Sequence, residues 1–275
     1  MATTTDATRT GRGAGAAEST ARSTTAGRLT ALGRAELTLL VRNRAMLFVA
    51  LLMPVMMVAA VQGWSKQLDY EKTAMSVAEA SVTAGIGFVL LFVVHANLVS
   101  AYVARREELV LKRLRTGEVS DREILVGTAL PAGALAVAQC VLIAAVSLVA
   151  FDVSAPERPD LVVAGIVLGL VLMVALAAVV SVGTRTVESA QLTTLPLLTV
   201  SLLGSGLFVP LELLPEKVAS VCELLPLTGV MTLVRSGWTG GGDAKDLVGA
   251  AVTALAWIVV SVFAVQRWFR WEPRR

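Results

Sequence analysis

Long stretches without a charged residue alternate along the chain with shorter segments in which the charges gather. Six stretches are long enough to cross a bilayer: residues 45–63, 82–104, 124–150, 161–184, 189–211 and 247–266. A helix rises about 1.5 Å per residue, so about 20 apolar residues span a hydrocarbon core of roughly 30 Å. Lipid offers the backbone no hydrogen-bond partner, and transmembrane strands would appear as short alternating segments. The pattern therefore predicts an all-α integral membrane protein with six transmembrane helices.

The third stretch is unusually long and contains Pro131, which removes a backbone donor within a helix. We expect this helix to start later than residue 124 or to kink near the proline. In the fourth stretch, Gly165 and Gly169 have the spacing that lets two membrane helices approach closely, and we expect them to pack within the bundle.

The overall composition agrees with a chain that resides in lipid. Hydrophobic residues make up 55% of the chain and charged residues 16%, whereas soluble domains carry about 25% charged residues. A soluble domain of this size buries only about three quarters of its unfolded surface, so this much apolar surface requires another solvent. A disordered chain and a disulfide-stapled secreted domain are excluded.

The basic residues are distributed asymmetrically between the two sides of the predicted spans. Of the 24 Lys and Arg residues, 18 lie in the N-terminal segment, in the loops after the second and fourth spans, and in the tail. The positive-inside rule therefore places both termini in the cytoplasm. Residues 1–26 are rich in Thr, Ala, Gly and Ser, and we expect a disordered cytoplasmic tail there. Residues 271–275 form a second cytoplasmic tail after a transmembrane domain of residues 45–270.

Residues 27–44 are amphipathic and precede the first span. Leucines share one face of this segment, and Glu36 falls within that face. The pattern predicts a helix that lies in the cytoplasmic interface. Whether Glu36 makes a buried salt bridge or contacts a partner stays open.

The loop of residues 105–123 is dense in charges of both signs, yet Leu111 and Leu114 give one side of a short helix an apolar surface. Two interpretations fit this pattern. The loop is either a solvated, positive-inside loop or a helix that docks on a cytoplasmic partner and passes force to the second and third spans.

The last exterior loop contains two short apolar segments, residues 215–225 and 228–237, separated by Pro226. Each segment is too short to span a bilayer. We therefore predict a re-entrant helical hairpin that dips into the outer leaflet between the fifth and sixth spans. A seventh span broken at Pro226 would instead put the basic C-terminal tail outside.

The chain lacks the residues that most catalytic or energy-coupling sites need. It contains no Gly-Lys dipeptide and therefore no phosphate-binding loop, and no Asp or Glu lies inside a predicted span. One histidine and two separated cysteines provide neither a nucleophile–base pair nor a set of metal ligands. We therefore expect no catalytic residue, no metal site and no enzyme activity of its own.

Four polar side chains lie within the predicted spans and are candidates for lining a substrate path: His95, Asn97, Gln139 and Gln191. For His95 we expect a neutral imidazole that bonds across helices with Asn97 or Ser100. A proton relay is the alternative role.

Several short motifs occur in a characteristic order on this six-span frame. They are Arg42-Asn43-Arg44 before the first span, Arg106-Glu107-Glu108 and Leu111–Arg115 after the second, Ser205–Leu211 with Leu214-Pro215 at the exit of the fifth, and then Leu225–Thr228 and Arg235. In these features the chain resembles the membrane subunits of type 2 ATP-binding-cassette exporters, within the group of daunorubicin-resistance-like permeases. It departs from that group at Leu109-Val110 and at Glu118.

The resemblance implies a half-transporter that pairs with a second copy or a paralogue and binds cytoplasmic ATPase subunits. ATP and Mg would be bound by that partner, with no cofactor in this chain. The residues implied in ATPase coupling are Glu36, Arg106, Glu107, Glu108, Lys112, Arg113 and Arg115. Those implied in the outer gate are Pro210, Pro215, Pro226 and Arg235.

The function implied is export of an amphipathic drug or lipid-like molecule across the plasma membrane of a bacterium. We expect membrane lipid as a partner and no nucleic acid. A membrane scaffold that recruits a cytoplasmic regulatory protein without transporting anything is the alternative.

Overall fold

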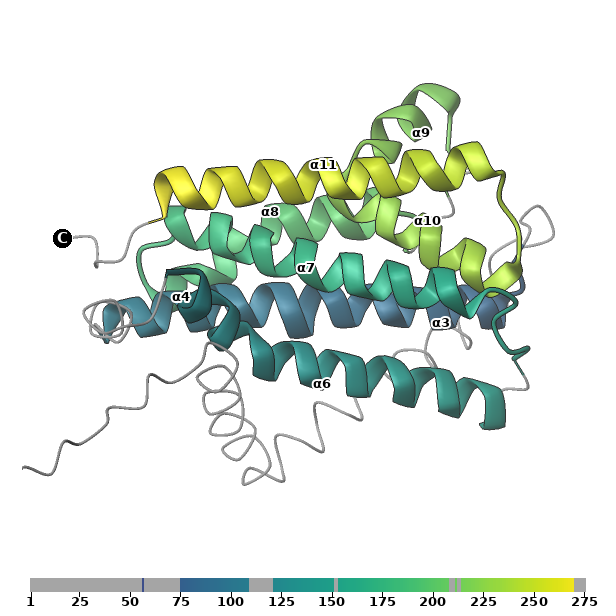
Figure 1. Cartoon of the computed structure of the whole chain (residues 1–275), viewed down its shortest axis with the longest axis horizontal. Helices are drawn as coiled ribbons and strands as arrows, with labels where there is room; N and C mark the ends of the chain where they lie inside the picture. Colours follow the sequence, from purple (N-terminus) through teal and green to yellow (C-terminus); the bar gives the residue numbers. More distant parts are fainter. Residues whose placement is uncertain are drawn as a thin grey trace, which may run out of the picture.

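The computed structural model describes residue 56 and residues 75–108, 121–150, 153–207, 211 and 214–269. Within these ranges the chain forms helices and no strand, which confirms the all-α expectation there. The helices are α3 (Val77–Phe88), η3 (Val89–Ala96), α4 (Asn97–Glu107), α6 (Asp121–Ala150), α7 (Pro159–Gly183), α8 (Val187–Gly204), α9 (Glu216–Glu223), α10 (Pro226–Thr239) and α11 (Ala244–Trp268). Most of them run side by side in one elongated bundle (Figure 1). Apart from Met56, the predicted tails, the interfacial helix and the first span lie outside the described residues.

Four helices of the described part are long and apolar enough to cross a membrane. They are the continuous helix of residues 77–107, which comprises α3, η3 and α4, and then α6, α7 and α11. These four coincide with the predicted second, third, fourth and sixth spans. The pair α9 and α10 would make a fifth if it counts as one span, although its two helices are bent by 96°.

Two helices differ from the sequence-based expectation at their ends. The helix α6 begins at Asp121 and continues through Pro131, so the expected later start is wrong, and the alternative of a kink near Pro131 stays a prediction. The helix α8 ends at Gly204, seven residues before the predicted end of the fifth span. It is 18 residues long and is not among the helices that are apolar enough to cross a membrane, because it contains Glu188, Gln191 and several threonines.

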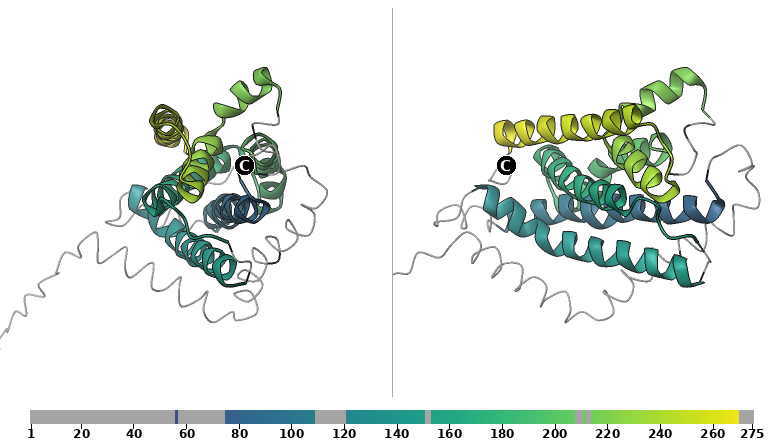
Figure 2. Two further views of the ribbon diagram at one scale, coloured as in Figure 1. Left: turned by 90° about the vertical axis from the view of Figure 1, so that its right-hand side faces the viewer. Right: turned by 45° about the vertical axis from the view of Figure 1, so that its right-hand side comes forward.

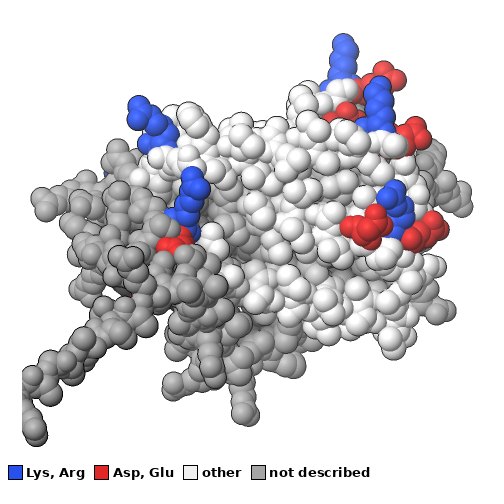
Figure 3. Space-filling view, in the orientation of Figure 1, with Lys and Arg blue, Asp and Glu red and all other residues white. Residues whose placement is uncertain are grey.

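The charged side chains gather at the two ends of the bundle. On the face shown in Figure 3, a broad band without charge separates two charged ends. The helices α4, α7 and α11 have their last residues at one end of the bundle, which we name the loop end. The helices α7 and α11 have their first residues at the opposite end, which we name the hairpin end. The ring of Phe269, directly after α11, meets Tyr102 of α4 edge-on, with 6.4 Å between ring centroids. The C-terminal end of α11 thus lies beside the base of the 105–123 loop.

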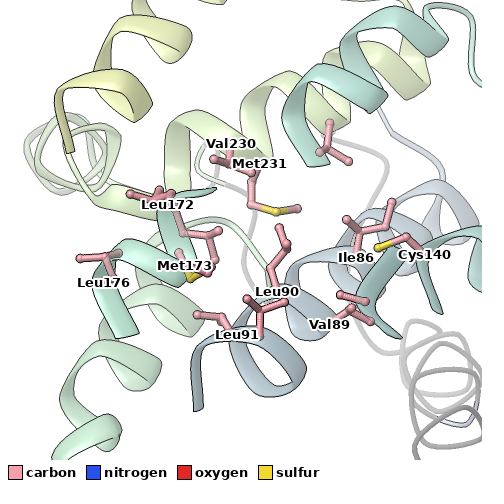
Figure 4. Close-up of a cluster of buried hydrophobic side chains, with 14 of the residues drawn as sticks. Ile86, Val89, Leu90, Leu91, Cys140, Leu172, Met173, Leu176, Val230 and Met231 are labelled. Carbon is pink, nitrogen blue, oxygen red and sulfur yellow. The ribbon is translucent and has the colours of Figure 1, made fainter. Parts of the chain in front are cut away.

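The core lies where η3, α7 and α10 meet (Figure 4). Leu90 and Leu91 of η3, Leu172 and Met173 of α7, and Val230 and Met231 of α10 are all fully buried there. The helix α7 packs against η3, α4, α6, α8, α10 and α11, so it forms the central rod of the described bundle.

Glycines let α10 approach its neighbours closely. A Cβ atom on Gly165 of α7 would lie 2.7 Å from Val234 Cγ2, and one on Gly169 would lie 2.9 Å from Val230 Cγ1. This confirms the close helix packing expected from the spacing of these two glycines. On the other side of α10, a Cβ on Gly229 would overlap the backbone carbonyl oxygen of Ala250 in α11.

The change Gly229→Ala tests this packing. We expect it to lower the free energy of unfolding by about 1–3 kcal/mol, because a backbone carbonyl has no rotamer with which to make room. Thermal unfolding in detergent measures the effect. The matched control is Gly133→Ala on α6, where an added Cβ meets no atom within 4 Å. It should leave stability unchanged or raise it by up to about 1 kcal/mol. Equal stability of the two variants would contradict the close approach of α10 to α11.

Candidate functional site

Side chains of α4 tie the loop end of the bundle together. The hydroxyl of Tyr102 donates to the Leu125 carbonyl of α6 at 3.1 Å, and Arg105 Nη1 donates to Thr128 Oγ1 at 3.1 Å. Both bonds join the last turns of α4 to the first turns of α6. The two helices that flank the 105–123 loop are thus joined side by side where the loop begins and ends.

Arg106 makes a second connection, from α4 to α7. Its side chain is only 1% exposed. Nη1 donates to the Ser181 carbonyl at 2.9 Å, and Nη2 donates to the Thr184 carbonyl. Carbonyl groups in the last turn of a helix have no partner within the helix and carry the negative end of its dipole, so a cation is favoured there. Arg106 therefore caps α7 and fixes the end of α4 against it.

The residues predicted to couple to an ATPase thus fall into three groups. Glu107 and Glu108 are exposed at the end of α4, whereas Arg106 is buried. The remaining four lie outside the described residues: Glu36, Lys112, Arg113 and Arg115. The sequence did not reveal the burial of Arg106, because an arginine in a charged loop normally faces solvent.

At the hairpin end, hydroxyl groups join α8 to the pair α9 and α10. Thr228 Oγ1 in the first turn of α10 donates to the Cys222 carbonyl of α9 at 2.6 Å and lies 3.3 Å from Ser205 Oγ. Ser205 directly follows Gly204, the last residue of α8. These polar groups were not among the predicted site residues, although both stand in the motifs that carry the family resemblance. For Thr228 the available signal was its position two residues after Pro226, whereas no sequence feature indicated a helix break at Ser205.

Arg235 of α10 reaches the same junction. Its Nη2 donates to the Ser205 carbonyl, so a cation again lies at the C-terminal end of a helix. Gly206, with a φ of +70°, follows directly, and a Cβ there would overlap the guanidinium group. Of the gate residues, Pro215 precedes α9, Pro226 opens α10 and Arg235 lies in this junction. Pro210 lies outside the described residues.

The four polar candidates for a substrate path do not form one surface. His95 and Gln139 are fully buried, whereas Asn97 and Gln191 are exposed. The expected bond from His95 to Asn97 or Ser100 is wrong: Asn97 is exposed and Ser100 Oγ donates to the Ala96 carbonyl of its own helix at 3.3 Å. Two residues along a helix turn the chain to nearly the opposite face, which explains the position of Asn97.

His95 lies in the π-helical segment η3, beside the backbone of Met173 in α7. Neither ring nitrogen makes a hydrogen bond of normal geometry. Single π turns inside α-helices frequently mark functional positions, and η3 interrupts the regular helix near the middle of residues 77–107. The proton-relay role considered for His95 stays a hypothesis.

Comparison with known proteins adds one match. A family model described as ABC-2 type transporter matches residues 28–238, about three quarters of the chain. No curated protein matches the chain. Within the described ranges, no three His, Cys, Asp or Glu side chains lie together as metal ligands do.

The cap on α7 can be tested with Arg106→Leu. We expect a loss of about 2–3 kcal/mol in the free energy of unfolding, because two carbonyl groups lose a charged donor in a buried position. Arg106→Lys should restore only part of it, since an ammonium group lacks the planar fork that reaches two oxygens. The control is Arg105→Gln, which removes a partly exposed bond and should cost less than about 1 kcal/mol. Chemical denaturation in detergent measures the free energy of unfolding of the three variants. Equal losses in Arg105→Gln and Arg106→Leu would show that the burial of Arg106 contributes nothing to stability.

Proposed function

The chain belongs to the ABC-2 type transporter family, and from this premise we propose that it is the permease of an ATP-driven exporter. The match to the family over residues 28–238 is the observation that carries the proposal. The exporter would move an amphipathic drug or lipid-like molecule out of the cell. A separate ATPase would supply the energy, in agreement with a sequence that contains no Gly-Lys phosphate loop and no acidic residue within a predicted span. We also infer a pair of such chains, either two copies or this chain with a paralogue.

We place the loop end of the bundle in the cytoplasm and the hairpin end outside. The excess of Lys and Arg in the loops of the loop end supports this orientation. The contact between Phe269 and Tyr102 supports it further, because it brings the basic C-terminal tail to the same end as the basic 105–123 loop. We propose that this membrane is the plasma membrane of a bacterium.

The ATPase would dock on the 105–123 loop and contact the exposed Glu107 and Glu108. Movement of this loop would reach the bundle through two connections. Arg106 passes it to the end of α7, while Tyr102 and Arg105 pass it to the start of α6. In this mechanism Arg106 acts as a positioning residue and not as a direct contact of the ATPase.

The helices α9 and α10 would form the outer gate. At its outer end α10 is bonded to the start of α7, since the Arg158 amide donates to the Gly237 carbonyl at 2.9 Å. A displacement of α7 from its cytoplasmic end is therefore conveyed to α10. The apolar surfaces of the spans suit an amphipathic cargo.

Reconstitution into liposomes tests the proposal. The chain together with its ATPase should move a fluorescent amphiphile only when ATP is present. The chain alone should move none, with or without a proton or sodium gradient. Transport by the chain alone down an ion gradient would overturn the proposal. ATPase binding without any ATP-dependent movement across a panel of amphiphiles would favour the scaffold function instead.

The role of the exposed carboxylates is tested by the double change Glu107→Arg with Glu108→Arg. We expect ATP-driven transport to fall at least about tenfold, because a docking contact of about 1.4 kcal/mol or more would become repulsive. Co-purification of the ATPase should fall with it.

The matched control reverses two exposed carboxylates at the opposite end of the bundle, Asp243→Arg with Asp246→Arg. This control should leave ATPase co-purification unchanged, since no cytoplasmic partner reaches that end. Equal effects of the two double variants would point to a general response to charge and would contradict docking at the loop end.

A further inference from the structure

The two short helices at the hairpin end differ sharply in burial. In α10, 11 of 14 residues are buried. In α9, Cys222 is the one buried residue, and the stripe of Val218, Val221 and Leu224 is exposed, with Val221 at 63%. Figure 2 shows α9 projecting away from the bundle in both views. The hairpin therefore consists of one fixed helix and one that touches the bundle at its end.

The contacts that hold α9 are concentrated at its C-terminal end. The indole Nε1 of Trp257 in α11 donates to the Leu224 carbonyl at 2.8 Å, and Thr228 Oγ1 donates to the Cys222 carbonyl at 2.6 Å. Among the described residues, no hydrogen bond from another helix reaches α9 before Cys222. These two bonds lie next to the junction of α9 with α10, so a rotation of α9 relative to α10 would have to break them.

The surroundings of this point are fixed. The first turn of α10 packs backbone to backbone on α11 through Gly229, and Thr228 is buried beside Ser205 of α8. The bend of 96° between α9 and α10 falls at Leu224 and Leu225. Rotation of α9 would therefore occur at these two residues and would leave α10 in place.

We propose that α9 is a hinged flap on the outer gate, and that the hydrogen bond from Trp257 to Leu224 holds it closed. This deepens the proposed function, on which its role in export rests. Trp257 is a positioning residue: its N–H satisfies the carbonyl of Leu224, directly after α9, at a point about halfway along α11 where lipid offers no other donor. Without that bond, the closed flap loses its main connection to α11.

The chain contains a reporter of this movement. The thiol of Cys222 is free and the residue is only 9% exposed, packed beside Gly204 at the end of α8. Rotation of α9 would uncover it. Cys140 in α6 is also free and is 4% exposed, but it lies beside Ile86 inside the bundle, away from the flap (Figure 4). A flap movement would expose Cys222 alone, whereas general loosening of the bundle would expose both thiols.

The experiment measures the rate at which N-ethylmaleimide labels each cysteine in the full chain in lipid nanodiscs, by mass spectrometry. Trp257→Phe keeps an aromatic ring and removes the N–H donor. We expect the labelling rate of Cys222 to rise about three- to tenfold, in line with the loss of one hydrogen bond, while Cys140 keeps its rate. Thr228→Val, which removes the second bond to α9, should also raise the rate for Cys222.

The matched control is Trp238→Phe in α10, because the indole nitrogen of Trp238 is buried without a hydrogen-bond partner. It should leave the rate for Cys222 unchanged. An unchanged rate in Trp257→Phe, a parallel rise at Cys140, or an equal rise in Trp238→Phe would each overturn the flap. Because labelling needs neither ATPase nor cargo, these outcomes are independent of the liposome assay. Failure of transport in that assay would not contradict the proposed flap.

Discussion

The last carbonyl groups of a helix have no partner within that helix, and inside a bilayer they have no water either. This constraint shapes both ends of the bundle. Side chains from neighbouring helices supply the missing donors: Arg106 for α7, Arg235 for the end of α8, and Trp257 for α9. Each of these bonds fixes one helix end against another helix, so the caps also determine how the helices are joined.

The helix α7 connects these two ends. Arg106 holds its last turn next to the 105–123 loop, and at its other end the amides of Glu157 and Arg158 donate to the last turn of α10. Along its length, Gly165 and Gly169 bring it into close contact with α10. A single stiff rod thus runs from the surface where we place the ATPase to the helices where we place the outer gate. The proposed ATPase surface and the proposed outer gate are therefore connected by α7 itself, without a flexible segment between them.

The sequence was sufficient to predict the positions of most helices, because a charge-free run of about 20 residues has few alternatives in lipid. It also predicted the break at Pro226 and the close packing of Gly165 and Gly169. It did not predict where α8 ends, since the stop at Gly204 depends on Ser205 meeting Thr228 and Arg235 from a distant segment. The burial of Arg106 was missed for the same reason: its partners at Ser181 and Thr184 lie about 75 residues further along the chain. Local pattern predicts which segments become helices, but it does not predict which helix end will be capped by which side chain.

The near-complete burial of α10 has a consequence for how the protein responds to its membrane. The helices α6 and α11 expose long apolar faces, so a thicker or thinner bilayer would be accommodated by tilting them. The helix α10 reaches only part of the way through the bundle and is surrounded by protein on nearly every side. Its position is set by glycine contacts with α7 and α11 and not by lipid length. The position of α10 is therefore insulated from hydrophobic mismatch, whereas the tilts of α6 and α11 would follow the thickness of the bilayer.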